Sequence, residues 1–258
     1  VQVQLDNPSS VLMLSGGVDS VAVLKQLLEE TDEDIYAHHI HFKNNEGRNN
    51  IKRYKAEAKA LKKIVPYMKR NFRDFHYSES TIDVRQIFNL HSGSFDEKDL
   101  ELKQKSSYSL YDSVYYYMIG GILSNITNSS SMYNGEMHPP PTREHRSKTF
   151  FNRHKEQSSI FYGASWPHKA QIKYPFFDEY CKRQSIEYLG KELMDMVWYC
   201  RHPINKDGKL LSCNTNLGFY TPAIDPETDE IFKCRSCKDV SNVMIEIEEE
   251  RQRGIRYG

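Results

Sequence analysis

The sequence has no excess of charge of either sign. Its 35 lysines and arginines balance its 35 aspartates and glutamates, so the formal net charge is +0. Without a global basic field, a protein does not attract nucleic acid by overall electrostatics alone. The balance favours a small-molecule substrate, or a partner guided by a local patch, and leaves nucleic acid as a less favoured partner.

Long hydrophobic runs are also missing. No apolar stretch approaches the roughly 20 residues that a transmembrane helix needs. Residues Val1 to Asp6 lack the basic start and the apolar stretch of a signal peptide. We therefore expect a protein without a membrane partner, with the cytoplasm as its compartment.

Cysteine is scarce and odd in number, with Cys181, Cys200, Cys213, Cys234 and Cys237. An odd count in a chain expected in the cytoplasm argues against a disulfide framework and favours metal ligation. Cys181 lies within a helical pattern, so we interpret it as a buried packing residue rather than a ligand.

The apolar pattern predicts strands and helices in alternation. A chain of 258 residues can bury a full-sized core, as one domain with an appendage. The alternation indicates βαβ units and a mostly parallel sheet, whose ligands lie outside the carboxyl ends of the strands. The expected strands are 11–14, 35–42, 72–77 and 131–135. The expected helices are 18–28, 51–68, 108–122, 175–196 with a break near 184–185, and 240–253.

A short loop joins the first expected strand to the first expected helix, and it consists of Ser15, Gly16, Gly17, Val18, Asp19 and Ser20. Its glycines allow a sharp turn and leave amide N–H groups free to converge on phosphate oxygens. The helix behind it adds the positive end of its dipole. Ser15 and Ser20 offer hydroxyl donors. Asp19 would repel a polyphosphate directly, so we assign it to Mg²⁺, and Asp19 and Ser20 become the catalytic candidates.

Two common nucleotide-binding motifs are absent from the chain. It contains neither GxxxxGK[ST] nor GxGxxG after a strand. The alternative interpretation of the loop is a plain glycine turn with a helix cap, which any α/β protein can contain. The position of the whole string at the first junction between strand and helix favours phosphate binding.

The string SGGVDS at 15–20 resembles the SGGxDS signature of the PP-loop, or N-type, ATP pyrophosphatases. That family includes 7-cyano-7-deazaguanine synthase, NAD synthetase, GMP synthetase, asparagine synthetase and several tRNA thiolation enzymes. The resemblance implies a Rossmann-like parallel sheet of the adenine nucleotide alpha hydrolase type. It also implies that ATP is cleaved to AMP and pyrophosphate, and that an adenylated substrate oxygen is displaced by a nitrogen or sulfur nucleophile.

Four cysteines near the end of the chain are candidates for a structural Zn²⁺ site. Cys234 and Cys237 form a CxxC pair, and Cys200 and Cys213 are the natural partners for tetrahedral thiolate ligation. His202 is an alternative ligand, and four reduced thiols without metal remain the other interpretation. The segment has little apolar periodicity, so a metal would supply the stability that a core does not.

The C-terminal third resembles 7-cyano-7-deazaguanine synthase within that family, on residues 174–179, 186–190 and 198–200. In that enzyme a similar helical stretch leads into the first of four zinc cysteines. The resemblance implies a carbon–nitrogen ligase that adenylates the carboxylate of 7-carboxy-7-deazaguanine, on the route to queuosine. Ammonia then carries the substrate through an amide to the nitrile. We expect an ATP-binding α/β domain at 1–170 and a helical, zinc-binding region at 171–258.

The segment between residues 136 and 157 is rich in basic residues and proline. Arg143 and Arg146 are candidate substrate ligands because a guanidinium can grip a carboxylate with two hydrogen bonds. Lys169 and Lys173 are candidates for the pyrophosphate. A solvated charge run is an equally weighted interpretation of the basic segment.

Two other functions stay open at this stage. One is another PP-loop activity, such as tRNA thiolation or amidation, with the basic segment in contact with RNA. The other is a zinc-containing binding protein whose nucleotide fold is catalytically idle. A homodimer is compatible with each of these functions.

Three histidines lie close together in the second expected strand. Alternation along a strand places His39 and His41 on one face and His38 on the other. No carboxylate stands at a ligand spacing from them in the sequence, so we interpret them as strand histidines rather than metal ligands.

Overall fold

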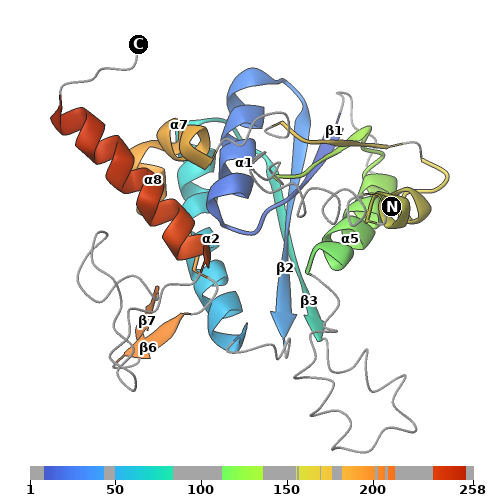
Figure 1. Ribbon diagram of the computed structural model, residues 1–258. Helices are drawn as coiled ribbons and strands as arrows, with labels where there is room; N and C mark the ends of the chain where they lie inside the picture. Colours follow the sequence, from blue (N-terminus) through green and yellow to red (C-terminus); the bar gives the residue numbers. More distant parts are fainter. Residues whose placement is uncertain are drawn as a thin grey trace, which may run out of the picture.

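The computed structural model describes residues 9–43, 50–83, 112–135, 155, 157–168, 170–175, 182–200, 203–206, 209–212 and 235–253. Its main sheet has five strands in the order β3-β2-β1-β4-β5, and every neighbouring pair is parallel. Figure 1 labels the first three strands of the chain, β1, β2 and β3. The strands are β1 (Ser9–Met13), β2 (Asp34–Lys43), β3 (His76–Asp83), β4 (Ser131–Tyr133) and β5 (Gln171–Lys173). This sheet confirms the expected α/β fold with a parallel sheet.

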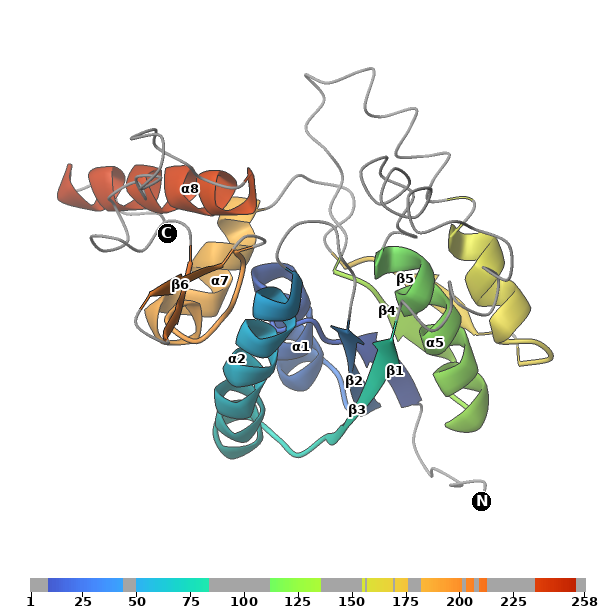
Figure 2. The ribbon, with the colours of Figure 1, turned by 90° about the horizontal axis from the view of Figure 1, so that it is seen from below.

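Helices cover both faces of this sheet. Helices α1 (Val18–Glu30) and α2 (Asn50–Asn71) lie on one side, and α5 (Asp112–Ile126) lies on the other (Figure 2). Strand β1 runs between them with all five of its residues buried. A strand covered on both faces requires an almost continuous apolar run, which Val11 to Leu14 provide.

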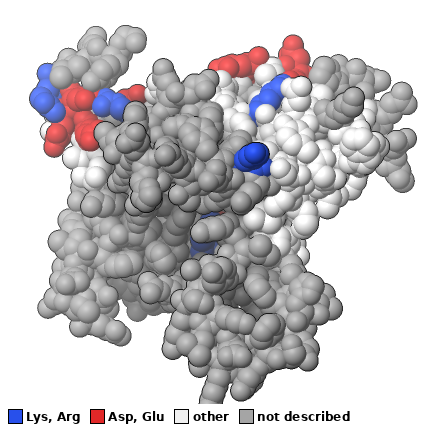
Figure 3. Space-filling model, turned by 45° about the vertical axis from the view of Figure 1, so that its right-hand side comes forward, with Lys and Arg blue, Asp and Glu red and all other residues white. Residues whose placement is uncertain are grey.

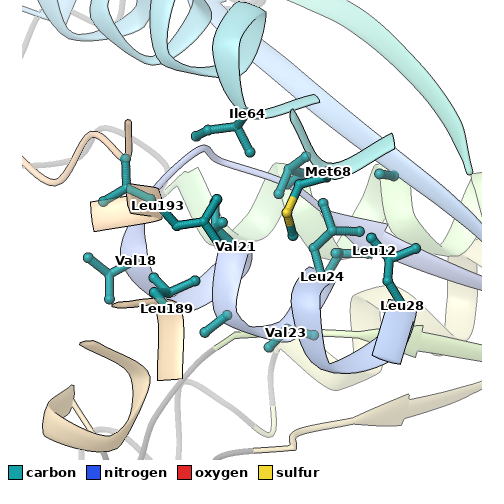
Figure 4. Packing of buried hydrophobic residues seen from close by; sticks show 14 of the residues in the cluster. Leu12, Val18, Val21, Val23, Leu24, Leu28, Ile64, Met68, Leu189 and Leu193 are labelled. Atoms are coloured by element: carbon teal, nitrogen blue, oxygen red, sulfur yellow. The ribbon is translucent and has the colours of Figure 1, made fainter. Parts of the chain in front are cut away.

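Each face of the sheet has its own core. On the side of α1 and α2, buried residues such as Leu12, Val21, Leu24 and Ile64 form the larger cluster (Figure 4). On the side of α5, the cluster includes Val11 and other residues, namely Met13, Ile40, Phe42, Tyr115, Tyr117, Met132, Phe161 and Ala170. The alternation of β1 between the two clusters holds the following loop in place from both sides.

The C-terminal region adds α7 (Lys182–Met194), α8 (Arg235–Gln252) and a small antiparallel hairpin of β6 (Ile204–Lys206) and β7 (Lys209–Leu211). Leu189 and Leu193 of α7 belong to the same buried cluster as α1, as Figure 4 shows. Strand β5 begins at Gln171, the first residue of the region that the sequence analysis separates from the first domain. The division of the chain at residue 170 stays a prediction.

Most expected elements are confirmed, with two corrections. The strand expected at 72–77 is β3, which begins only at His76. Residues before it form a connection in which the Arg73 guanidinium donates to main-chain carbonyls at the end of α1, including those of Thr31 (2.9 Å) and Glu33 (2.7 Å). The break expected near 184–185 is also wrong, because the only backbone departure in α7 is at Gly190, with φ of 69°.

Among the described helices, none combines the length and the apolar character needed to cross a membrane.

Strand β5 and the hairpin of β6 and β7 lack any counterpart in the sequence analysis, because three-residue strands are too short to show a period.

Candidate phosphate-binding site

The candidate loop lies at the carboxyl edge of the sheet. After β1 ends, the Leu14 amide still donates to the His38 carbonyl of β2 at 2.8 Å. The chain then leaves the sheet at Ser15, and α1 begins at Val18. The loop thus stands where ligands of parallel sheets bind.

Gly16 sets the turn of this loop. Its φ of +77° lies in the left-handed region, which an L residue with a side chain adopts only at an energetic cost. A Cβ atom at this position would also stand 3.1 Å from Leu61 Cγ of α2. The glycine is therefore required for both the backbone conformation and the close approach of α2.

The two serine hydroxyls hold the loop in shape. Ser20 Oγ lies 3.0 Å from Ser15 Oγ and accepts the Ser15 amide at 3.2 Å, and it is also 3.3 Å from the Gly17 carbonyl. The Gly17 amide donates to Ser15 Oγ at 3.3 Å. In this structure both hydroxyls form hydrogen bonds within the loop and stabilise its conformation.

The first turn of α1 leaves its amides available. Gly17 is the N-cap and makes no capping hydrogen bond through a side chain. Among the described residues, none accepts a hydrogen bond from the amides of Val18, Asp19 or Ser20. The first N–H groups of a helix have no partner inside the helix and carry the positive end of its dipole. This combination can bind a phosphate group.

Asp19 is paired with a residue far along the chain. The Lys182 ammonium, at the first position of α7, donates to the Asp19 carboxylate. The exposed fraction is 17% for the Lys182 side chain and 37% for that of Asp19, so water reaches the pair from one side. The sequence analysis missed Lys182, because no spacing pattern links two residues 163 positions apart.

Two further segments fix the position of the loop. The Trp198 amide, just after α7, donates to the Gly16 carbonyl at 2.9 Å. Gly135, just after β4, lies so close to α1 that a Cβ atom there would be 2.9 Å from the Asp19 carbonyl carbon and 3.0 Å from the Ser20 nitrogen. The loop is therefore enclosed by the chain that follows β4 and by the chain that follows α7.

Several residues named from the sequence cannot be placed at this site. Arg143, Arg146 and Lys169 lie outside the described residues. Lys173 of β5 is described: its ammonium donates to the Tyr133 hydroxyl at 3.2 Å and lies 3.7 Å from the Glu33 carboxylate. Burial tends to lower the pKa of Lys173, but these two partners outweigh it and the net shift of the pKa is upward. Lys173 is thus a charged lysine with an acidic neighbour rather than a cation held at the loop.

Two of the four candidate zinc ligands lie together. Cys200 and Cys237 are both buried, belong to one cluster with Trp198 and Tyr199, and are not in a disulfide. Cys213 and Cys234 lie outside the described residues, as do Cys181 and His202. Within the described ranges there is no group of three or more His, Cys, Asp or Glu side chains placed for a metal. Two of the four cysteines, 37 positions apart in the sequence, are thus members of one buried cluster.

Comparisons with known proteins add a structural likeness. No family model matches the chain, and no curated protein matches it. Among solved structures, it is similar to the U34-tRNA thiolase NcsA from Methanococcus maripaludis, described with its [4Fe-4S] cluster. The identity is 12%, the TM-score is 0.46, and the match covers 95% of this chain and 68% of that one.

Proposed function

We propose that this chain is a PP-loop ATP pyrophosphatase, an enzyme that adenylates an oxygen of its substrate and releases pyrophosphate. The observation that carries the proposal is the loop 15–20, with three unpartnered amides at the start of α1 among the described residues and the ion pair of Asp19 and Lys182 beside them. A plain helix cap needs neither a left-handed glycine nor a half-buried cationic partner from a helix far along the chain. A polyphosphate site uses both.

The loop and its neighbours supply charge where the reaction develops it. A substrate oxygen attacks the α-phosphorus of ATP, the bond to the bridging oxygen breaks, and its electron pair leaves with pyrophosphate. Amides of the first turn of α1 stabilise the negative charge on the leaving group, because they are already oriented before the reaction starts. Lys182 contributes a full positive charge next to them. The site also holds the attacking oxygen, the α-phosphorus and the leaving pyrophosphate in line, and this positioning lowers the activation barrier further.

Asp19 fits the role of a Mg²⁺ ligand. Its carboxylate is a hard oxygen donor, is partly exposed to water and lies at the phosphate loop. When bound, Mg²⁺ neutralises phosphate charge and lets a carboxylate lie near the nucleotide. Asp19 would hold the metal, and the Lys182 ammonium, now its ion-pair partner, would bind a phosphate oxygen.

For the substrate, we propose a deazapurine carboxylate of the 7-carboxy-7-deazaguanine type, with ammonia as the nucleophile and 7-cyano-7-deazaguanine as the product. The support is the resemblance of residues 174–179, 186–190 and 198–200 to 7-cyano-7-deazaguanine synthase and the shared position of Cys200 and Cys237. Arg143, Arg146 and Lys169 are the proposed contacts to the acidic groups of the substrate. Zn²⁺ held by Cys200, Cys213, Cys234 and Cys237 would stabilise the C-terminal region, and the chemistry would not pass through it.

The balanced charge of the sequence favours a small substrate over RNA, because a phosphate backbone is usually bound by an excess of basic residues. On the face shown in Figure 3, the few described lysine and arginine side chains lie apart from one another, some of them next to acidic side chains. We therefore keep tRNA as a comparison substrate in the assay.

The test is pyrophosphate release by the purified chain with Mg-ATP. We expect release that depends on 7-carboxy-7-deazaguanine plus ammonium, and little release with tRNA. The Asp19→Ala variant should lose turnover while it keeps its fold and zinc content. Folded protein that releases no pyrophosphate with either substrate would refute the proposal, and release with tRNA alone would replace the substrate while keeping the ATP chemistry.

A further inference from the structure

A pair of histidines on β2 has hydrogen-bonding atoms that no described residue satisfies. His39 is buried, with an exposed fraction of 0%, and its Nδ1 lies 2.9 Å from the Leu14 carbonyl oxygen. The His39 Nε2 atom is buried without a partner, and so is the Nδ1 atom of His41. A buried polar atom without a partner lowers the stability of the folded protein, because it has lost its hydrogen bonds to water. Such an atom therefore calls for an explanation, such as a bound ion or water.

The partners of the two rings define their tautomers. A carbonyl only accepts, so His39 Nδ1 carries the proton and Nε2 presents a lone pair.

His41 has a carboxylate as its partner. His41 Nε2 lies 2.8 Å from Glu79 Oε2, whose other oxygen accepts the Tyr77 hydroxyl at 2.6 Å. Burial alone would raise the pKa of Glu79, but hydrogen bonds from Tyr77 and His41 outweigh it and lower the pKa. A carboxylate accepts, so His41 Nε2 donates to Glu79, and Nδ1 is the ring nitrogen that remains for another partner.

These features together are those of metal ligands. Histidines that bind a metal almost always donate their other ring N–H to a carbonyl or a carboxylate, which fixes the tautomer and the ring orientation. Here one ring has the carbonyl and the other has the carboxylate. The ring centres are 4.5 Å apart and the rings are nearly perpendicular, at 88°. Two imidazoles on one zinc ion, each at about 2.0–2.1 Å, have centres roughly 4.5–5.5 Å apart.

We infer that His39 Nε2 and His41 Nδ1 form a binding site for Zn²⁺ or a similar divalent transition metal, separate from the cysteine cluster. Imidazole ligands suit such metals. The described residues provide no third His, Cys, Asp or Glu for this pair, so the remaining positions on the metal are open to water or to a ligand. The His41 side chain is 13% exposed while its Nδ1 atom is buried, so the site lies just beneath the surface.

The site adjoins the candidate phosphate loop. Leu14, whose carbonyl fixes His39, is the residue immediately before Ser15. The carboxyl edge of the sheet therefore holds the histidine pair beside the loop. The inference does not depend on the proposed ATP chemistry, because it rests on the hydrogen bonds of the two rings alone.

The experiment separates this site from the cysteines by ligand type. The chelator-treated full chain is titrated with Co²⁺, and bound metal is characterised by absorption and X-ray absorption spectroscopy. We expect one equivalent with nitrogen and oxygen ligands, in addition to any Co²⁺ at the cysteines, which would be recognised by its thiolate-to-metal charge-transfer band. That equivalent should persist in the Cys234→Ser, Cys237→Ser double variant and disappear in His41→Asn.

Two further variants sharpen this measurement: one is a control that should keep the metal, and the other should weaken its binding. His38→Asn changes a histidine of the same strand that faces the other way, toward Ser78 (2.8 Å) and Ser80 (2.9 Å), and should keep the metal. Glu79→Gln should weaken Co²⁺ binding by about 10- to 100-fold, because Glu79 orients a ligand without touching the metal. If His41→Asn does not fold, Glu79→Gln decides the test. Nitrogen-ligated metal that is equal in the wild type, His41→Asn and Glu79→Gln, or a proton shared between the two rings with no metal bound, would overturn the inference.

Discussion

The ammonium of Lys182, the first residue of α7, is ion-paired with the carboxylate of Asp19 in the first turn of α1. The two residues are 163 positions apart in the sequence, and the pair lies beside amides that have no partner among the described residues. A C-terminal helix thereby contributes a charge to a loop formed by the first strand and helix.

Replacement of Lys182 should impair ATP turnover more than folding. We expect Lys182→Ala to lower kcat/KM for Mg-ATP at least about tenfold, which is a loss of about 1.4 kcal/mol of transition-state stabilisation. The measurement is pyrophosphate release at varied ATP concentrations. The control is Arg183→Ala, since Arg183 pairs with Glu187 and Glu250 rather than with the loop. Equal losses in both variants would contradict a role for Lys182 at the phosphates.

The glycines around the loop should differ in their tolerance of alanine. Gly16→Ala adds a Cβ at a φ of +77°, and we expect it to cost about 1–2 kcal/mol in stability and to weaken ATP binding. Gly135→Ala places a Cβ against the backbone of Asp19 and should displace the first turn of α1. Gly163→Ala is the control, because a Cβ there meets no atom within 4 Å. Thermal unfolding and ATP affinity measure both effects, and unchanged ATP affinity in Gly16→Ala and Gly135→Ala would show that the loop geometry is unimportant.

The packing of α7 on α1 should be visible in unfolding. Leu189 and Leu193 have exposed fractions of 4% and 2% in the cluster shared with α1 and α2. Truncation of either to alanine should destabilise the protein by about 2–5 kcal/mol, in a single transition with the sheet. Lys191→Ala, at an exposed position of the same helix, should change stability by less than about 0.5 kcal/mol. Separate transitions for the sheet and for α7 would indicate independently folding units.

Stability should depend on pH through His39. Its pKa is lowered from 6.5 to about 4 in the folded state, mainly by burial, so the unfolded chain binds more protons between these values. The free energy of unfolding should therefore rise as the pH increases from about 4 to 6.5, by up to roughly 3 kcal/mol for this group. His38, whose pKa burial also lowers, acts in the same direction.

This pH dependence is measured by chemical denaturation of chelator-treated protein, since a bound metal would compete with protons for His39. The His39→Asn variant removes the titrating group, so its stability curve should be flatter in the same range. A wild-type curve that is flat between pH 4 and 6.5 would show that His39 is not buried as a neutral ring.

The local pattern predicted most of the fold, because buried helices and strands impose periods that can be counted. Residues 18–28 and 35–42 repeat at helical and strand spacing, and both elements occur as expected. Strand β3 was misplaced because Phe72 and Phe75 look like strand residues, whereas Arg73 between them is anchored to the end of α1. A connection of that kind is determined by hydrogen bonds to a distant segment.

The surroundings of His39 and His41 could also be predicted only in part from the sequence. The strand alternation correctly placed His39 and His41 on one face, and no carboxylate stood near them in the sequence. Parallel pairing of β2 with β3 sets His39 beside Glu79 in register, and His41 then reaches its carboxylate. Register between strands depends on the whole sheet, so the pairing could not be deduced from either strand alone.

By itself, the sequence determined that a glycine-rich loop with a serine at each end joins a buried strand to a helix. Flexible glycines and the helix start are local properties, and they are sufficient to indicate a phosphate site. Only the tertiary structure brought Lys182 to Asp19, Gly135 to the first turn of α1 and Trp198 to Gly16. These contacts join residues that are more than a hundred positions apart, and they form because α7 and β4 pack against a common core, an outcome that no local spacing encodes.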